Sequence, residues 1–292
     1  MIQVVLKAVA VLAWLAVVAS YGARIHPVGD SLAVFRVGLL VVAALAVIWT
    51  DWSRWLRWPL ALVALGVLGW HVWMRLPSQS LEPGQFLLYQ QNLLYNRTED
   101  AAFLAQISEL EPDFITLQEV SKRNEAITDA LRATYPTQQL CRAQSQSTEA
   151  VLSRFPSVPG TAFCSTPDGL AGVQIQTPSG PVWLISLHVA WPWPYRQPDQ
   201  VDRLMDELLA LEGPVILAGD FNSVAWSWTV KRVARASGTQ RVGKHLHTFG
   251  DMPVPMHLGI DHVLTTSGLG SVEQMPTLGS DHNGVLARLD GF

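Results

Sequence analysis

The sequence predicts a layered α/β sandwich preceded by three membrane-spanning helices. Residues 1–76 contain three long apolar stretches, and strand-like and helix-like segments alternate after residue 85. Several of the strand-like segments are continuous apolar runs, a pattern typical of strands that are covered on both faces. Buried strands with helices between and after them favour packed layers around one core.

The charge of the chain divides near residue 76. Residues 1–76 carry six basic and two acidic side chains, a net charge of +4, and residues 77–292 carry 14 and 22, a net charge of −8. With 49% hydrophobic and 15% charged residues, the chain as a whole is neither disordered nor a coiled coil. The sequence therefore predicts a membrane anchor over 1–76, a linker over 77–85 and an acidic globular domain over 86–292. The acidic domain argues against tight non-specific binding to nucleic acid, because that binding needs basic side chains.

The three apolar stretches of the anchor cover residues 4–22, 31–49 and 58–74. Each is near the lower limit of the ~17–25 residues that cross a bilayer. A cleaved signal peptide is the alternative for the first stretch, but the two stretches that follow favour three anchoring helices. Tryptophans cluster around the second loop, at 49, 52, 55 and 58. Tryptophan is enriched at membrane–water interfaces, so this cluster indicates that the loop lies at one.

The basic side chains favour one orientation by a small excess. With the N-terminus inside, Lys7, Arg54 and Arg57 face the cytoplasm, while two other arginines face outward. Three spans then carry the globular domain to the outside. We therefore expect a multi-pass protein of the cytoplasmic membrane whose globular domain is extracytoplasmic.

The two cysteines of the chain, Cys141 and Cys164, both lie in the globular part. If two neighbouring strands carry them, they can form a disulfide, which persists outside the cytoplasm. The alternative is a pair of buried thiols. The sequence leaves both open.

The globular part alternates strands and helices. We expect strands at 86–92, 113–119, 150–155, 171–177, 182–189, 214–222, 257–266 and 283–289. We expect a helix over 98–110 with Thr98 as its N-cap, a helix over 121–135 that Pro136 stops, and a helix over 201–213 that Gly213 ends.

Polar side chains recur where the apolar strands end. Taken singly, each has an ordinary explanation as a turn residue, a helix-dipole contact or a buried histidine. Together they favour one site, because Mg²⁺ prefers carboxylate and carboxamide oxygens and histidine acts as a general base. Residues two apart on a strand share a face, which brings the last carboxylate and carboxamide of the 214–222 run together. The set comprises Asn92, Glu119, His188, Asp220, Asn222, Asp261, Asp281 and His282.

Seven motifs carry a resemblance to a known family. In chain order they are QNLLYN, ITLQEV, AVLSRFP, SLHV, AGDFNS, IDHV and GSDHN, within residues 86–289. They resemble the endonuclease/exonuclease/phosphatase superfamily of metal-dependent phosphoesterases, which includes pancreatic deoxyribonuclease, neutral sphingomyelinases and inositol polyphosphate phosphatases. The resemblance implies a four-layer α/β sandwich, with two packed sheets flanked by helices.

The resemblance also implies how the site is divided between metal and base. Asn92 and Glu119 would hold a divalent cation, Mg²⁺ with Mn²⁺ as the alternative. Asp281 would assist the metal or its water shell. His282, oriented by Asp261, would take a proton from the attacking water.

The remaining roles concern charge on the phosphoryl group. By the resemblance, Asp220 would help position the water, Asn222 would hydrogen-bond the phosphoryl oxygens, and His188 would stabilise developing charge or support the leaving group. His188 favours the deoxyribonuclease, sphingomyelinase and inositol phosphatase branches, because abasic-site endonucleases usually have tyrosine there. Glu149 is a candidate to steady His188, with a solvated surface glutamate as the alternative.

Two further segments bear on the substrate. The loop after His188 carries Trp191, Trp193 and Tyr195, for which packing against the sandwich is favoured over contact with a lipid or a base. A basic cluster follows the AGDFNS motif, and the solvated face of a helix is favoured over a phosphate-binding ridge. Its members are Lys231, Arg232, Arg235, Arg241 and Lys244.

The sequence thus predicts a membrane-anchored, Mg²⁺-dependent phosphoester hydrolase of the phosphodiesterase type. A tether near the bilayer favours a phospholipid or a soluble phosphate ester over chromosomal DNA. The alternatives are an endonuclease or exonuclease acting on DNA or RNA, and a non-catalytic binding module, which would lack a motif residue. The expected partners are a phosphorylated small molecule, phospholipid or nucleic acid as substrate, and the lipid bilayer, with no protein partner.

Overall fold

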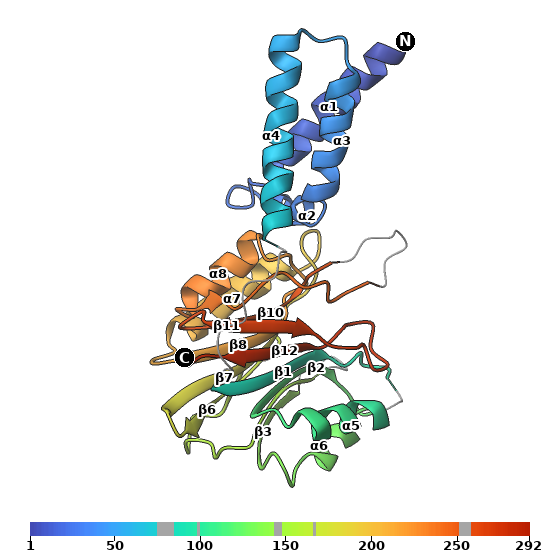
Figure 1. Ribbon diagram of the computed structural model, residues 1–292. Helices are drawn as coiled ribbons and strands as arrows, with labels where there is room; N and C mark the ends of the chain where they lie inside the picture. Colours follow the sequence, from blue (N-terminus) through green and yellow to red (C-terminus); the bar gives the residue numbers. More distant parts are fainter. Residues whose placement is uncertain (75–84, 98–99, 143–147, 166–167, 251–257) are drawn as a thin grey trace.

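The computed structural model describes residues 1–74, 85–97, 100–142, 148–165, 168–250 and 258–292. A bundle of helices stands on one end of a globular α/β part (Figure 1). The proposed linker over 77–85 lies outside the described residues except for Gln85, and so does the proposed N-cap Thr98.

The helical bundle contains α1 (Ile2–Ala19), α2 (Val28–Val34), α3 (Arg36–Trp49) and α4 (Arg54–Trp73). Small residues such as Ala44 and Ala64 are buried between the helices, which lets their backbones approach closely. Large apolar side chains point outward, including Leu12 and Leu62, which are 65% and 66% exposed. Such an apolar outer surface is disfavoured in water and suits a hydrocarbon environment.

Among the described residues, α1 and α4 are long and apolar enough to cross a membrane. The second predicted span, 31–49, is not one straight helix. It bends by 74° between α2 and α3, so a third span exists only if this bent pair counts as one. The break lies at Phe35, whose φ of −94° and ψ of 1° depart from helical values, and the side chains of Asp30 and Ser31 on α2 bond to the globular part.

Two six-stranded mixed sheets form the globular part. The first sheet has the order β11-β12-β1-β2-β4-β3, and the second has the order β5-β6-β7-β8-β10-β9. The first contains β1 (Phe86–Asn92), β2 (Phe114–Val120), β3 (Thr137–Arg142), β4 (Thr148–Ser153), β11 (Gly270–Gln274) and β12 (Val285–Leu289). The second contains β5 (Phe163–Ser165), β6 (Leu170–Thr177), β7 (Gly180–His188), β8 (Val215–Asp220), β9 (Gln240–Arg241) and β10 (Asp261–Thr265).

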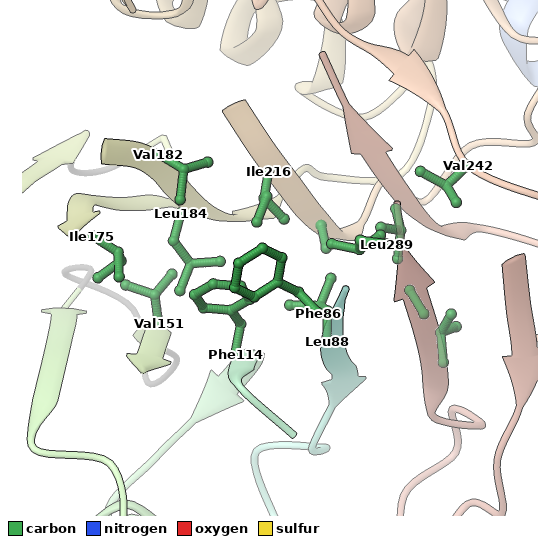
Figure 2. Packing of buried hydrophobic residues seen from close by; sticks show 14 of the residues in the cluster. Phe86, Leu88, Phe114, Val151, Ile175, Val182, Leu184, Ile216, Val242 and Leu289 are labelled. Atoms are coloured by element: carbon green, nitrogen blue, oxygen red, sulfur yellow. The ribbon is translucent and has the colours of Figure 1, made fainter. Parts of the chain in front are cut away.

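The main core lies between the two sheets. Phe86 and Phe114 from the first sheet pack there against Val182, Leu184 and Ile216 from the second (Figure 2). A second apolar cluster joins α5 (Ala101–Leu110) and α6 (Ala126–Ala130) to the outer face of the first sheet. A third joins α7 (Gln197–Leu209) and α8 (Trp228–Ala236) to the outer face of the second. The layers therefore run helix, sheet, sheet, helix, which accounts for the continuous apolar runs in the central strands.

All eight predicted strands overlap observed ones, whereas the short strands β3, β5, β9 and β11 were not predicted. The predicted helix over 121–135 is wrong in length, because only 126–130 is helical. Asn124 accepts a hydrogen bond from the Ser121 amide at 2.7 Å, and this local bond closes a turn where a helix would begin. Helix α7 ends at Leu209, four residues before Gly213.

A disulfide joins Cys141 on β3 to Cys164 on β5. These strands lie at the edges of different sheets, so the bond ties the two sheets together. Between the two alternatives left by the sequence, the structure therefore has the disulfide.

Removal of this disulfide is expected to lower the free energy of unfolding by about 2–4 kcal/mol, because the unfolded chain regains the freedom of a closed loop. The double variant Cys141→Ser with Cys164→Ser avoids leaving one free thiol. Urea unfolding of the full chain in detergent, with and without reductant, measures the change. Identical curves for the wild type in oxidising and reducing buffer would contradict a stabilising bond.

Candidate active site

The polar strand ends meet at one edge of the sandwich. Strands β1 and β2 are parallel, and so are β7 and β8, so their carboxyl ends lie at the same side of each sheet. His188 on β7 and Asp261 on β10 are both register partners of Asp220, the last residue of β8. Gly219, just before Asp220, has no Cβ to collide with the Leu187 carbonyl, which explains the glycine of the AGDFN motif.

Asn92 and Glu119 lie in direct contact. The Nδ2 of Asn92 donates to Glu119 Oε1 at 3.1 Å and to Asp220 Oδ2 at 3.1 Å. Glu119 has a left-handed φ of 56°, and the ladder between β2 and β4 changes register around it. A bulge of this kind redirects a side chain at the end of a strand, and strained backbone is characteristic of functional sites.

Asp281 lies beside this pair. The hydroxyl of Ser280 donates to the Asn92 carbonyl at 2.7 Å, which ties the segment before His282 to the end of β1. Burial raises the pKa of the Asp281 carboxyl, an effect that His282 opposes and the Glu119 carboxylate reinforces. Asp281 is therefore near both His282 and Glu119.

His282 and Asp261 form a buried hydrogen-bonded pair. The Nδ1 of His282 lies 2.9 Å from Asp261 Oδ2, and its Nε2 faces Asp220 Oδ2 at 3.7 Å. Gln90 donates to the other oxygen of Asp261 at 3.0 Å and fixes the carboxylate. Burial alone would lower the pKa of His282, but the Asp261 and Asp220 carboxylates override it and raise this pKa to about 10. The ring is thus held with one nitrogen bonded and the other directed into the site.

His188 faces three carboxylates. Its Nδ1 lies 3.6 Å from Glu149 Oε1, and its Nε2 lies 3.6 Å from Asp220 Oδ2 and 3.9 Å from Glu119 Oε1. Burial acts to lower the pKa of His188, but these carboxylates raise it to about 9. Glu149 is only 2% exposed, so the alternative of a solvated surface glutamate is wrong.

Asp220 and Asn222 close the site from the second sheet. The backbone amide of Asn222 donates to Asp220 Oδ1 at 2.8 Å, and the side-chain Nδ2 of Asn222 donates to the Val189 carbonyl at 2.9 Å. Asn222 adopts a left-handed φ of 45°, which turns its side chain back toward Asp220. Burial raises the pKa of Asp220 to about 6, an effect that His282 opposes and Asp261 reinforces. All eight predicted site residues thus lie at this edge of the sandwich.

A buried polar network behind the site was not predicted. Gln90 bonds to Gln118 at 2.8 Å, and Gln118 bonds to Ser186 at 2.9 Å, so the network crosses from the first sheet to the second. All three residues are fully buried. The signal in the sequence was a glutamine at an inward position of an otherwise apolar strand, where a polar group needs a buried partner.

The aromatic loop and the basic cluster gave mixed outcomes. Trp191 packs edge-on against Phe249 at a centroid distance of 5.7 Å, as the packing interpretation predicted, whereas Trp193 and Tyr195 are exposed. The basic side chains of α8 are not a freely solvated face, because Arg232 pairs with Asp202 at 2.6 Å and Arg235 lies over Trp228. Arg241 is half-buried, and this partial loss of water lowers its pKa to about 10.

Comparison with known proteins decides the family. A family model described as the endonuclease/exonuclease/phosphatase family matches residues 89–282, about two thirds of the chain. The chain belongs to this family. The match begins within β1 and ends at His282, so it includes every residue of the site.

Solved structures with the same fold support this assignment. Truncated TDP2 from Caenorhabditis elegans is 18% identical, with a TM-score of 0.56 over 69% of this chain and 96% of its own. An AP endonuclease from Archaeoglobus fulgidus is 16% identical, with a TM-score of 0.54 over 71% and 100%. The 3′ phosphatase NExo from Neisseria, bound to a product DNA hairpin, is 16% identical, with a TM-score of 0.53 over 70% and 100%. No curated protein matches the chain.

The endonuclease/exonuclease/phosphatase enzymes are hydrolases that typically use a divalent metal, and the residues of this site fit one. The Glu119 and Asp220 carboxylates both accept hydrogen bonds from Asn92 Nδ2, and Asp281 lies near Glu119, so the site offers carboxylate oxygens of the kind that Mg²⁺ or Mn²⁺ prefers. The Asn92 Oδ1 atom accepts from the Leu94 amide at 2.9 Å, so the Asn92 side chain would have to turn to present this oxygen to a metal. Among the residues that the structure describes, the group of carboxylates and histidines whose ligand atoms all lie within 4.8 Å of one another is Asp220, Asp261 and His282. In that group the Nδ1 of His282 is already bonded to Asp261, which suits a supported base better than a metal ligand.

Proposed function

We propose that this protein is a membrane-anchored, divalent-metal-dependent phosphoester hydrolase of the phosphodiesterase type, in which His282 activates the attacking water. One observation carries the proposal. His282 is bonded through Nδ1 to Asp261, and its Nε2 is directed at the carboxylates of a site that also contains Asn92 and Glu119. A base next to a group of hard oxygen donors is the arrangement that metal-assisted hydrolysis requires.

We assign the metal to Asn92 and Glu119, with Asp281 supporting the metal or its water shell. The contact between Asn92 and Glu119 and the nearness of Asp281 support this assignment. When bound, a divalent cation supplies positive charge that polarises the phosphoryl oxygens and lowers the pKa of nearby histidines. Mg²⁺ is the proposed ion, and Mn²⁺ is the alternative.

The other residues handle the proton and the developing charge. His282 Nε2 takes the proton of the attacking water, and Asp261 holds the ring and stabilises the imidazolium that forms. Asp220, between the two histidines, orients the water. Asn222 and His188 hydrogen-bond oxygens of the phosphoryl and leaving groups, where negative charge accumulates in an in-line displacement. Glu149 orients His188.

The proposed location is the cytoplasmic membrane, with the globular domain outside the cytoplasm. The apolar helices α1 and α4 support anchoring, and the Cys141–Cys164 disulfide supports an oxidising compartment. The excess of basic side chains at the loop containing Arg54 and Arg57 supports the orientation.

A nuclease is the second candidate, because structures of the same fold include an AP endonuclease and a 3′ phosphatase bound to a DNA product. The net charge of −8 on residues 77–292 weakens this candidate, since phosphate backbones need a basic surface.

Purified full chain in lipid nanodiscs tests the proposal against a panel of phosphoesters. The panel comprises bis(4-nitrophenyl) phosphate, 4-nitrophenyl phosphate, phospholipid in the nanodisc, plasmid DNA and a single-stranded oligonucleotide, each with Mg²⁺ or with EDTA. We expect Mg²⁺-dependent hydrolysis of the diester that exceeds hydrolysis of the monoester. Nicking of the plasmid at a comparable rate would favour the nuclease. A complete lack of hydrolysis, or hydrolysis that EDTA leaves unchanged, would overturn the proposal.

A further inference from the structure

We infer that the anchor completes the substrate site: an apolar pocket between α2 and the loop after β7 takes the hydrocarbon chain of an amphiphilic phosphodiester drawn from the bilayer. The inference rests on the proposed function and adds to it the class of substrate. It assigns a binding role to residues of the helical bundle, which lie outside the segment matched by the family model.

The helical bundle is docked on the globular domain through α2. The Asp30 carboxylate accepts hydrogen bonds from the backbone amides of Trp228 at 2.6 Å and Thr229 at 2.9 Å, at the N-terminus of α8. A carboxylate at this position also interacts favourably with the helix dipole. Trp226 Nε1 donates to the Ala33 carbonyl at 2.9 Å, and Ser31 donates to the Trp193 carbonyl. These bonds join the α2 end of the bundle to the globular part, which lies directly beneath it in Figure 1.

The pocket lies at this junction. Its volume is about 360 Å³, within the range of ~300–1,000 Å³ that is usual for ligand pockets. One wall comes from α2 and its end, and the other comes from the aromatic loop after β7. The main lining residues are Val34, Phe35, Trp191, Trp193, Tyr195 and Leu258. Since Phe35 directly precedes the apolar helix α3, the pocket begins where the bundle's lipid-facing surface ends.

Aromatic contacts connect the pocket to the base. Val34 and Trp191 pack in one apolar cluster with Phe249 and Leu258. The Trp191 ring lies 5.7 Å from the Phe249 ring, and the Phe249 ring lies 4.9 Å from the His282 ring, centroid to centroid. Two ring contacts therefore separate the pocket wall from the base. The pocket lining itself contains none of the site residues, so the chain of a diester whose phosphorus is beside His282 has to pass the Phe249 and Trp191 rings to enter the pocket.

The chemistry of the lining selects a hydrocarbon chain. The hydroxyl of Ser31, one of the few polar groups at the pocket, is already bonded to the Trp193 carbonyl. A nucleobase or a sugar would leave its own polar atoms unpaired there, which is costly. The aromatic walls are themselves partly open, with Phe35 45%, Trp193 43% and Tyr195 64% exposed. A bilayer-derived chain covers this surface, and the membrane-spanning helices deliver the protein to the source of such chains.

A series of 4-nitrophenyl alkyl phosphodiesters with ethyl, butyl, octyl and dodecyl chains tests the inference on the full chain in nanodiscs. For the wild type we expect kcat/KM to rise with chain length, by up to about fourfold per methylene buried. Val34→Trp fills the pocket and should reduce the slope of log kcat/KM against chain length by at least half. Val42→Trp is the matched control, because Val42 is 46% exposed on α3 and lies outside the pocket. The same substitution there should have a similar effect on how the protein sits in the bilayer. Val42→Trp should keep the wild-type slope.

Tyr195→Ala provides a second variant, which should leave the fold intact because Tyr195 is 64% exposed, and it should also lower the slope. Equal slopes in Val34→Trp and Val42→Trp, or no dependence on chain length in the wild type, would overturn the inference and leave the proposed function standing. If the wild type shows no dependence on chain length, any lipid in the pocket is not part of the substrate. Lack of hydrolysis of every ester in the series would overturn both.

Discussion

Replacement of His282 by glutamine is expected to lower kcat for phosphodiester hydrolysis by about 10²–10⁴-fold, the usual contribution of a general base. Glutamine keeps a polar side chain of similar reach but cannot accept a proton at neutral pH. KM should change much less, because the proton is transferred only in the transition state. Steady-state kinetics on bis(4-nitrophenyl) phosphate at saturating Mg²⁺ measures both constants.

The companion variant Asp261→Asn tests whether Asp261 acts by positioning His282, the proposed base. The Asp261 carboxylate raises the pKa of His282, so its loss lowers that pKa. Because the base acts in its neutral form, activity rises with pH as His282 loses its proton. The acidic limb of the kcat/KM profile should therefore move to lower pH in Asp261→Asn, while the maximal rate falls. An unshifted profile, or full activity in His282→Gln, would show that this histidine is not the base.

Glu119→Gln is expected to raise the Mg²⁺ concentration needed for half-maximal activity by at least about 100-fold. Loss of residues that merely support metal ligands already costs about 10–100-fold in affinity, and a ligand itself contributes more. Glutamine preserves the shape of the side chain but removes the charge that binds the cation. Activity measured over a Mg²⁺ titration, together with calorimetry of Mn²⁺ binding, tests this result.

Glu212→Gln is the matched control for that variant. Glu212 is exposed, and its hydrogen bond to Trp183 uses the backbone carbonyl. The same change of charge at this position should leave the Mg²⁺ requirement unchanged. If Glu119→Gln binds metal as the wild type does, the proposed assignment of the metal to Asn92 and Glu119 is wrong.

The motifs predicted the family and the residues of the site because each lies at or close to one end of an apolar strand that the core determines. Periodicity and apolar runs located β1, β7 and β8 well, since these strands are covered on both faces. The edge strands β3 and β11 escaped prediction because TQQLCR and GSVEQ contain few apolar residues and no continuous apolar run.

Long-range contacts were the other part that the sequence did not reveal. Nothing in the sequence near Asp30 indicates that its carboxylate bonds to α8, almost two hundred residues away. The burial of Glu149 against His188 and the Gln90–Gln118 bond likewise depend on how the two sheets face one another. Local patterns identify a polar residue in an apolar strand, but its partner is set by the packing of the sheets.

Anomalous diffraction from crystals of the full chain soaked in MnCl₂ would locate the metal relative to the base. We expect one buried Mn²⁺ with Glu119 and Asn92 among its ligands, while His282 Nδ1 remains bonded to Asp261. An ion held instead by Asp261 and His282, or the absence of any ion at this edge of the sandwich, would contradict the proposed metal site.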